Sequence, residues 1–218
     1  MTVLFTLLAV ALVRHAGPAH SAGTAHPMAT GSTSTPTAVV PTTVDTASAP
    51  TASTTATTAP VTMPVPGPVS TVGDSILLDF QSELQSAIPR VKVDGLVSRQ
   101  FETGIGIVQA DRAAGTLGNV LVVELGTNGP VTSSDFDAMM QAASGVQRVV
   151  FVNVNVPRSW AAPDNEVLAA GVARYPGLAV LADWNALSTG HPEWFTSDEV
   201  HLEPAGAQAM AILIAKYA

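Results

Sequence analysis

The stretch NVLVVEL, residues 119–125, is a nearly continuous apolar run, and Gly126-Thr127-Asn128-Gly129 follows it directly. A run of this length is typical of a parallel β-strand that is covered by helices on both faces. Glycine and asparagine favour the tight turn by which such a strand leads into a helix. The stretch therefore predicts a central strand of an α/β sheet, with a polar loop at its carboxyl end.

Strand and helix patterns alternate on both sides of this run. We expect strands over residues 69–72, 91–93, 119–125, 148–156 and 178–182, and helices over 75–87, 104–114, 134–144, 165–175 and 204–217. This order predicts a three-layer α/β fold with a parallel sheet of about five strands. Because ligands bind beyond the carboxyl ends of such strands, residues that follow the strands are expected to share one rim.

Two segments with reactive side chains stand at the ends of expected elements. Ser75 lies in Val72-Gly73-Asp74-Ser75, between the first strand and the first helix, and Asp198-Glu199-Val200-His201 precedes the last helix. A serine becomes a nucleophile when a base takes its proton, and histidine suits that task near neutral pH. A carboxylate beside the imidazole fixes its tautomer. The pattern predicts Ser75 as nucleophile, His201 as base and Asp198 as the acid that orients the base.

Acyl transfer through a serine also needs hydrogen-bond donors for the oxyanion. The candidates are the backbone N–H of Ser75, the side-chain amide of Asn128 and a backbone N–H near Ser98. Taken singly, each segment has an ordinary explanation, since serine often caps a helix and glycine with asparagine often forms a turn. Their occurrence together, in one α/β pattern, favours a catalytic site.

The first 68 residues differ from the rest. Val3–Val13 is an apolar run with the length of a signal-peptide core, yet no lysine or arginine precedes it. Residues 1–22 are consistent with a signal-like segment or membrane anchor, a remnant of a transmembrane helix, or a buried helix. Residues 23–68, rich in Ala, Thr, Ser and Pro, predict a disordered linker. The globular domain is expected over residues 69–218, in an extracytoplasmic location under the first two readings.

The composition excludes several classes of function. The chain of 218 residues has a formal net charge of −8, which disfavours binding to nucleic acid. It has no cysteine, so a thiol nucleophile, a cysteine-ligated metal and disulfides are excluded. No phosphate-binding glycine loop or cluster of metal ligands stands out, so we predict no cofactor and no metal. We expect a monomeric domain.

These motifs resemble the SGNH (GDSL-type) hydrolase superfamily over residues 69–218, and more narrowly the extracytoplasmic SGNH domain of bacterial peptidoglycan or surface-glycan O-acetyltransferases. The resemblance implies a flavodoxin-like fold, the triad Ser75, His201 and Asp198, and Asn128 as an oxyanion donor. Ser98 lies near the place of a second donor, which is glycine in many members. Glu199 stands where glycine is common. Three further residues, Gly126, Trp160 and Trp184, are candidate contacts to a sugar, and packing inside the domain is the alternative for each of the two tryptophans.

Three functions remain open from the sequence. The first is an extracytoplasmic serine esterase or O-acyltransferase that acts on acyl groups, above all acetyl groups, of cell-wall or surface glycans. Its partners would be the glycan or acyl-ester substrate and a membrane protein that donates acyl groups. The second is a non-catalytic module that binds glycans, and the third is a lipase or thioesterase of the same fold. His191 is expected to be a loop residue rather than a catalytic one.

Overall fold

The computed structural model describes residues 65–218, which form an α/β domain built on a five-stranded sheet. From the N-terminus the elements are β1 (Val69–Gly73), α1 (Ser75–Asp79), α2 (Gln81–Ala87), β2 (Val91–Gly95), α3 (Phe101–Ala114), β3 (Val120–Glu124), α4 (Ser133–Ala142), β4 (Arg148–Val152), α5 (Ala161–Ala173), β5 (Ala179–Ala182), α6 (Trp184–Ser188), the 3-10 helix η1 (Pro192–Trp194) and α7 (Pro204–Ala215).

The sheet is parallel throughout, and its strand order is β2-β1-β3-β4-β5. The chain therefore runs from β1 outward to β2, then crosses back to place β3 on the other side of β1. Such a reversal of direction opens a crevice at the carboxyl ends of the two central strands. The predicted fold class and strand number are confirmed.

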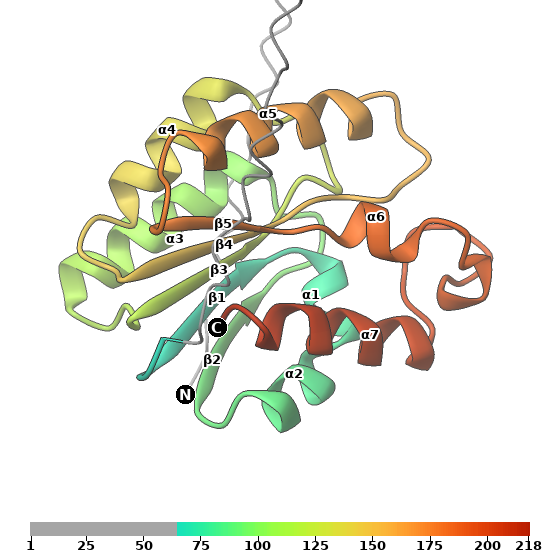
Figure 1. Cartoon of the computed structure of the whole chain (residues 1–218), viewed down its shortest axis with the longest axis horizontal. Helices are drawn as coiled ribbons and strands as arrows, with labels where there is room; N and C mark the ends of the chain where they lie inside the picture. The colour runs from blue at the N-terminus through green and yellow to red at the C-terminus, as the bar shows by residue number, and fades with distance from the viewer. Residues whose placement is uncertain (1–64) are drawn as a thin grey trace, which may run out of the picture. The chain divides into compact units, whose positions relative to one another are not determined.

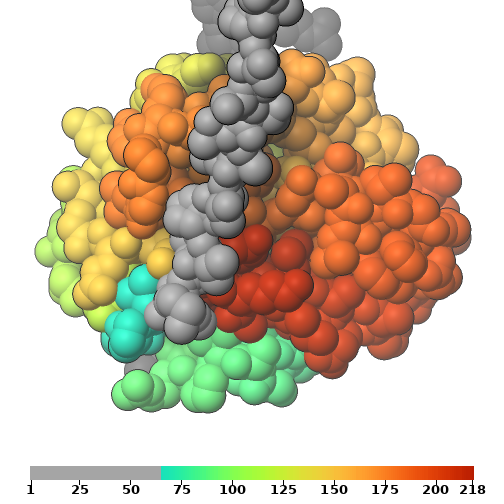
Figure 2. All heavy atoms as spheres, viewed as in Figure 1, coloured from blue at the N-terminus to red at the C-terminus, as the bar shows by residue number. Residues whose placement is uncertain are grey.

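The helices form a layer on each face of the sheet (Figure 1). Helices α1, α2 and α7 cover one face, where α2 and α7 pack together. Helices α3, α4 and α5 cover the other face side by side. Figure 2 shows atoms of the C-terminal part of the chain, coloured orange to red, over much of the right side of this view.

The strand β3 is buried along its whole length, as the apolar run predicts. Because side chains alternate along a strand, Val120 and Val122 pack into the core beneath α7, whereas Leu121 and Val123 pack into the core beneath α3 to α5. Because both faces of β3 are buried, its residues are apolar from Val120 to Val123 and do not alternate between apolar and polar.

Some element boundaries differ from the predicted ones. The helix predicted over 75–87 is interrupted at Phe80, whose side chain is fully buried and whose backbone leaves the helical region with φ −115°. The strand predicted over 148–156 ends at Val152. Beyond it, the Asn153 side chain bonds to the Asp183 carboxylate and to the backbone N–H of Asn185, so this segment is held by side-chain contacts instead of a ladder.

The N-terminal predictions fall largely beyond what the structure describes. Those for residues 1–22 and for residues 23–64 of the linker lie outside the described residues. Residues 65–68, also assigned to the linker, contact the domain: Val65 packs against the core, and the carbonyls of Pro66 and Pro68 accept hydrogen bonds from Asn119. Within residues 65–218, none of the helices has the length and apolar character to span a bilayer.

Two glycines in helices offer a matched test of the packing. A Cβ at Gly171 in α5 would lie 2.6 Å from the ring of Phe136, which is itself buried and stacked on Phe151. Gly171→Ala in the full-length chain is expected to destabilise the domain by about 1–3 kcal/mol in urea unfolding, because the ring cannot move aside. Gly106→Ala in α3 meets nothing within 4 Å and is expected to stabilise by about 0.5–1 kcal/mol. Equal effects of the two changes would contradict this packing.

Candidate active site

Ser75 is the first residue of α1 and follows the carboxyl end of β1 after a single residue. That residue, Asp74, caps the helix, since its Oδ1 accepts a hydrogen bond from the backbone N–H of Ile76 at 3.0 Å. The strand and the cap fix the direction in which the serine leaves the sheet. Ser75 is 9% exposed, so its hydroxyl is held in a nearly closed setting.

His201 lies opposite Ser75, on the segment between η1 and α7. Its Nε2 is 3.2 Å from the Ser75 hydroxyl, and its Nδ1 is 2.7 Å from Oδ2 of Asp198. The three side chains therefore form a continuous hydrogen-bonded relay, although 126 positions separate the serine from the histidine. This is the geometry in which a histidine can accept the proton of a serine.

The Asp198 carboxylate is held by several donors. Its Oδ1 accepts hydrogen bonds from the Thr196 hydroxyl at 2.6 Å and from the backbone N–H groups of Val200 and His201 at 2.9 and 3.0 Å. The hydrogen bonds from Thr196 and from His201 hold the pKa of Asp198 well below its usual range. The hydrogen bond to Asp198 in turn raises the pKa of His201, with a further contribution from the charge of Asp79. A raised pKa makes this imidazole a stronger base.

Asp79 connects the segment that carries His201 to α1, the helix that begins with Ser75. Its Oδ2 accepts a hydrogen bond from the backbone N–H of Leu202 at 3.0 Å. Burial raises the pKa of Asp79, while this hydrogen bond and His201 lower it. Asp79 lies four residues after Ser75 and so faces the same side of α1. Asp79 is a residue that was not predicted from the sequence, although its spacing from Ser75 was a signal for it.

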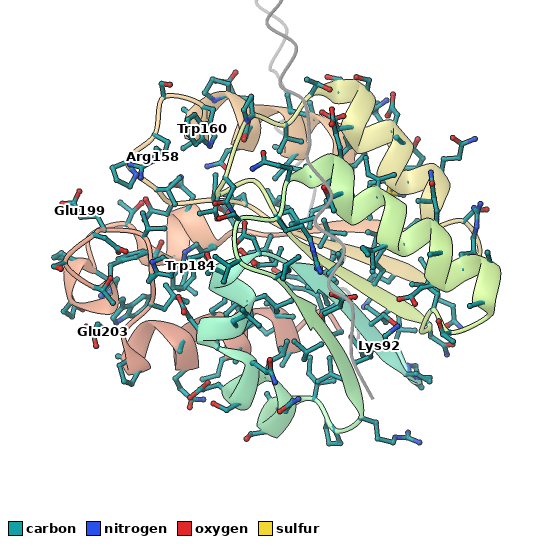
Figure 3. All side chains as sticks on the ribbon, turned by 180° about the vertical axis from the view of Figure 1, so that it is seen from behind. Lys92, Arg158, Trp160, Trp184, Glu199 and Glu203 are labelled. Atoms are coloured by element: carbon teal, nitrogen blue, oxygen red, sulfur yellow. The ribbon has the colours of Figure 1, made fainter. Side chains whose placement is uncertain are left out.

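A cavity of about 270 Å³ opens above Ser75 and His201. We call it the Ser75 cavity. Its lining residues are Ser75, Thr127, Asn128, Arg158, Trp160, Asp198, Val200 and His201. They come from the ends of β1, β3 and β4 and from the segment before α7, which is the rim that the strand order predicts. Figure 3 shows Arg158, Trp160 and Glu199 on this side of the domain and Lys92 at the far side.

Of the proposed oxyanion donors, Ser75 and Asn128 line the Ser75 cavity, whereas Ser98 does not. Ser98 is exposed in a turn after β2, with a left-handed backbone at φ 61°. The next residue, Arg99, is buried and anchors this turn, because it donates hydrogen bonds to the carbonyls of Gly73 and Asp94. An oxyanion role for the backbone near Ser98 stays a prediction.

The residues expected to contact a sugar have different environments. Trp160 lines the Ser75 cavity, and its Nε1 donates a hydrogen bond to the carbonyl of Gly126 at 3.1 Å. Gly126 is buried and does not line the cavity, so it positions Trp160 instead of offering a surface. For Trp184 the structure supports packing inside the domain over contact with a sugar, because this side chain is only 3% exposed and stacks on Trp194.

Two carboxyl groups, those of Asp74 and Glu124, are buried close to Ser75. Desolvation raises the pKa of Asp74 to about 6 against the lowering effect of hydrogen bonds from Ile76 and Thr127. Desolvation, reinforced by the nearby charge of Asp74, raises the pKa of Glu124 well above its usual value. Two such groups resist carrying full charges together. Among residues 65–218, no group of three or more His, Asp or Glu side chains is arranged to hold a metal ion.

Comparison with solved structures identifies the fold. The C-terminal catalytic domain of peptidoglycan O-acetyltransferase A from Streptococcus pneumoniae aligns with a TM-score of 0.61 at 23% identity, covering 72% of this chain and 93% of that one. A protein from Slackia heliotrinireducens described as an SGNH hydrolase aligns with a TM-score of 0.57 at 18% identity, covering 72% and 98%. The chain therefore has the fold of these SGNH proteins.

In sequence, this chain is similar to a part of bacterial O-acetyltransferases. It is 34% identical over 143 residues to the peptidoglycan O-acetyltransferase OatA of Listeria monocytogenes, covering 66% of this chain and 22% of that protein. It is 33% identical over 146 residues to the O-acetyltransferase OatA of Staphylococcus aureus, covering 66% and 24%. The chain thus spans about a quarter of the length of these relatives. No family profile matches it.

Replacement of Asp198 tests whether its carboxylate raises the pKa of His201. Asp198→Asn is expected to lower the pKa of His201, because the hydrogen-bonded carboxylate is the main group that raises it. In NMR titrations the imidazole signal of His201 should then titrate at lower pH than in the wild type. Any esterase rate should fall by about 10⁴-fold, the cost of losing this orientation in serine enzymes.

Asp137→Asn is the matched control, since Asp137 pairs with Arg174 on another part of the surface. It is expected to leave the titration of His201 unchanged. An unchanged titration in Asp198→Asn would show that the carboxylate does not act on the imidazole.

Proposed function

We propose that the chain is an extracytoplasmic serine enzyme that transfers or hydrolyses acetyl esters of cell-wall or surface glycans. The observation that carries the proposal is the hydrogen-bonded relay from Ser75 through His201 to Asp198, with the Asn128 amide in the same cavity. The acetyl group and the glycan are inferred from relatives that are named for peptidoglycan O-acetylation. The cell-envelope location is inferred from the same relatives.

The geometry supports an acyl-enzyme mechanism. His201 Nε2 takes the proton as Ser75 Oγ attacks the ester carbonyl, and the Ser75 N–H and the Asn128 amide donate to the oxyanion. Collapse of the tetrahedral intermediate breaks the ester bond, and His201 returns the proton to the leaving oxygen. A second nucleophile, activated by the same histidine, then takes the acyl group from Ser75. Water as this nucleophile gives an esterase, and a sugar hydroxyl gives a transferase.

The source of the acetyl group is a separate part of the proposal. The chain spans about a quarter of the length of its curated relatives. For transfer to a glycan, we infer that a membrane protein donates the acyl group to Ser75.

Loss of the nucleophile tests the proposal most simply. The wild-type chain is expected to release acetate from p-nitrophenyl acetate at pH 7–8, and Ser75→Ala should lower the rate by at least about 10³-fold. Ser86→Ala is the matched control, because Ser86 lies exposed on α2 and bonds only to the carbonyl of Ser82. Addition of glycan oligomers then separates the two outcomes, since a transferase forms O-acetylated sugar at the expense of free acetate.

A folded wild-type chain without acetate release, and without labelling of Ser75 by a fluorophosphonate, would reject the enzyme. Such a result would favour the non-catalytic glycan-binding module. Release that prefers long-chain acyl esters would favour the lipase or thioesterase instead.

A further inference from the structure

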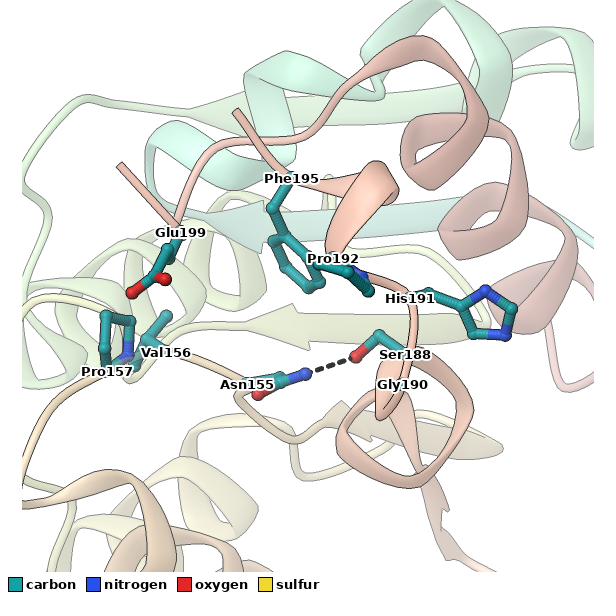
Figure 4. A pocket seen from close by; sticks show the side chains of 9 residues that line it. All are labelled: Asn155, Val156, Pro157, Ser188, Gly190, His191, Pro192, Phe195 and Glu199. Carbon is teal, nitrogen blue, oxygen red and sulfur yellow. Dashed lines mark hydrogen bonds between the residues drawn. The ribbon is translucent and has the colours of Figure 1, made fainter. Parts of the chain in front are cut away.

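A second cavity, of about 310 Å³, lies beside the Ser75 cavity (Figure 4). We call it the Asn155 cavity. Pro157 and Glu199 line it, whereas their chain neighbours Arg158 and Asp198 line the Ser75 cavity. The same two segments, one after β4 and one before α7, therefore form walls of both cavities.

The side chain of Asn155 is fixed in one orientation. Its Nδ2 donates a hydrogen bond to Ser188 Oγ at 2.8 Å, and this hydroxyl donates to the carbonyl of Trp184 at 2.7 Å. Ser188 is itself only 1% exposed, so the pair is part of the core. This bond uses one of the two N–H groups of the amide and fixes its orientation, and the amide oxygen accepts no hydrogen bond from any other described residue. Asn155 offers the cavity an acceptor.

Glu199 provides a second acceptor. In Figure 4 its carboxylate lies next to Pro157. This carboxylate makes no hydrogen bond or ion pair with residues of the described range. The backbone of Glu199 is left-handed at φ 60°, a conformation that favours glycine and costs energy in other residues. A glutamate held in such a conformation between Asp198 and His201 points to a use for its side chain.

The other walls of the Asn155 cavity are mostly apolar. Phe195 is half-buried, and Val156, Pro157 and Pro192 complete the surface. His191 is already engaged, because its ring stacks on Trp194 at 4.0 Å and its Nδ1 bonds to Glu193. Apolar walls with a few fixed polar groups are the usual make-up of a ligand site. Two acceptors, one of them negatively charged, suit a ligand that brings hydroxyl or amide N–H donors and carries no negative charge.

We propose that the Asn155 cavity is a subsite for a neutral sugar unit of the glycan acceptor, adjacent to the unit whose hydroxyl reaches Ser75. Asn155 and Glu199 accept hydrogen bonds from its hydroxyl or amide groups, and Phe195 with the prolines packs against its C–H face. The inference rests on the proposed function, because it assigns this cavity to the same substrate. With this subsite the enzyme discriminates between glycans by their length, since a single sugar unit cannot fill both cavities.

The test measures binding apart from catalysis. In the full-length Ser75→Ala protein, calorimetry is expected to show that a β-1,4-linked N-acetylglucosamine tetramer binds at least about ten-fold more tightly than the monosaccharide. Glu199→Gly in the same background should weaken tetramer binding by about ten-fold, the order expected for hydrogen bonds to a charged group. Glycine also adopts the left-handed conformation at position 199 without strain, so the variant is expected to unfold at an unchanged or higher temperature.

Glu203→Gln is the matched control. Glu203 carries the same charge in the same segment, at the start of α7, but lines neither cavity (Figure 3). Its Kd for the tetramer should equal that of the parent. The subsite is overturned if the tetramer binds no more tightly than the monosaccharide, or if Glu199→Gly leaves its Kd unchanged.

NMR locates the bound sugar independently of any variant. The tetramer is expected to shift the side-chain amide signals of Asn155 and the backbone amide of Phe195, and unchanged signals there would also reject the subsite. Acetate release by the wild type tests the proposed function separately. Tetramer binding that depends on Glu199, in a protein without esterase activity, would keep the subsite and reject the enzyme.

Discussion

The parallel pairing of β1 with β3 is the constraint on which the rest of the site depends. Their register places Gly73 opposite Glu124, and the backbone N–H of Asp74 donates to the carbonyl of Glu124 at 3.2 Å. The two strands therefore end together, and the loops that carry Ser75 and Asn128 leave the same edge. The cost of this arrangement is the burial of two carboxyl groups, Asp74 and Glu124, whose raised pKa values reflect their desolvation.

The histidine reaches this edge on a segment with its own supports. Phe195 and Leu202 form an isolated antiparallel bridge, and the N–H of Thr196 donates to the carbonyl of His201 at 2.8 Å. The bond from Leu202 to Asp79 then attaches the segment to α1. The loop is held by its own hydrogen bonds and by the bond to α1, the helix that begins with Ser75. These contacts explain how Nε2 of His201 lies 3.2 Å from the Ser75 hydroxyl.

How much the sequence could predict depends on the range of each interaction. The fold followed from the apolar run of β3 and the alternation around it, and Ser75, Asn128, Asp198 and His201 followed from their places at the ends of elements. The sequence left open whether Trp184 is buried, and it did not predict the walls of the Asn155 cavity. Both depend on how the segment between β5 and α7 folds back, and hydrophobic periodicity carries no information on that. Asp79 lay between these cases, since its spacing from Ser75 was visible but its partner, a backbone N–H, was not.

The central claim is that the fold makes Ser75 an activated nucleophile, and covalent modification measures this most directly. Native full-length protein treated with methanesulfonyl fluoride is expected to gain one methylsulfonyl group, and peptide mapping should place it on Ser75. The same reagent should leave Ser75 unmodified in urea, where His201 no longer lies beside it. A natively folded protein in which Ser75 stays unmodified, or reacts no faster than the other serines, would contradict the account.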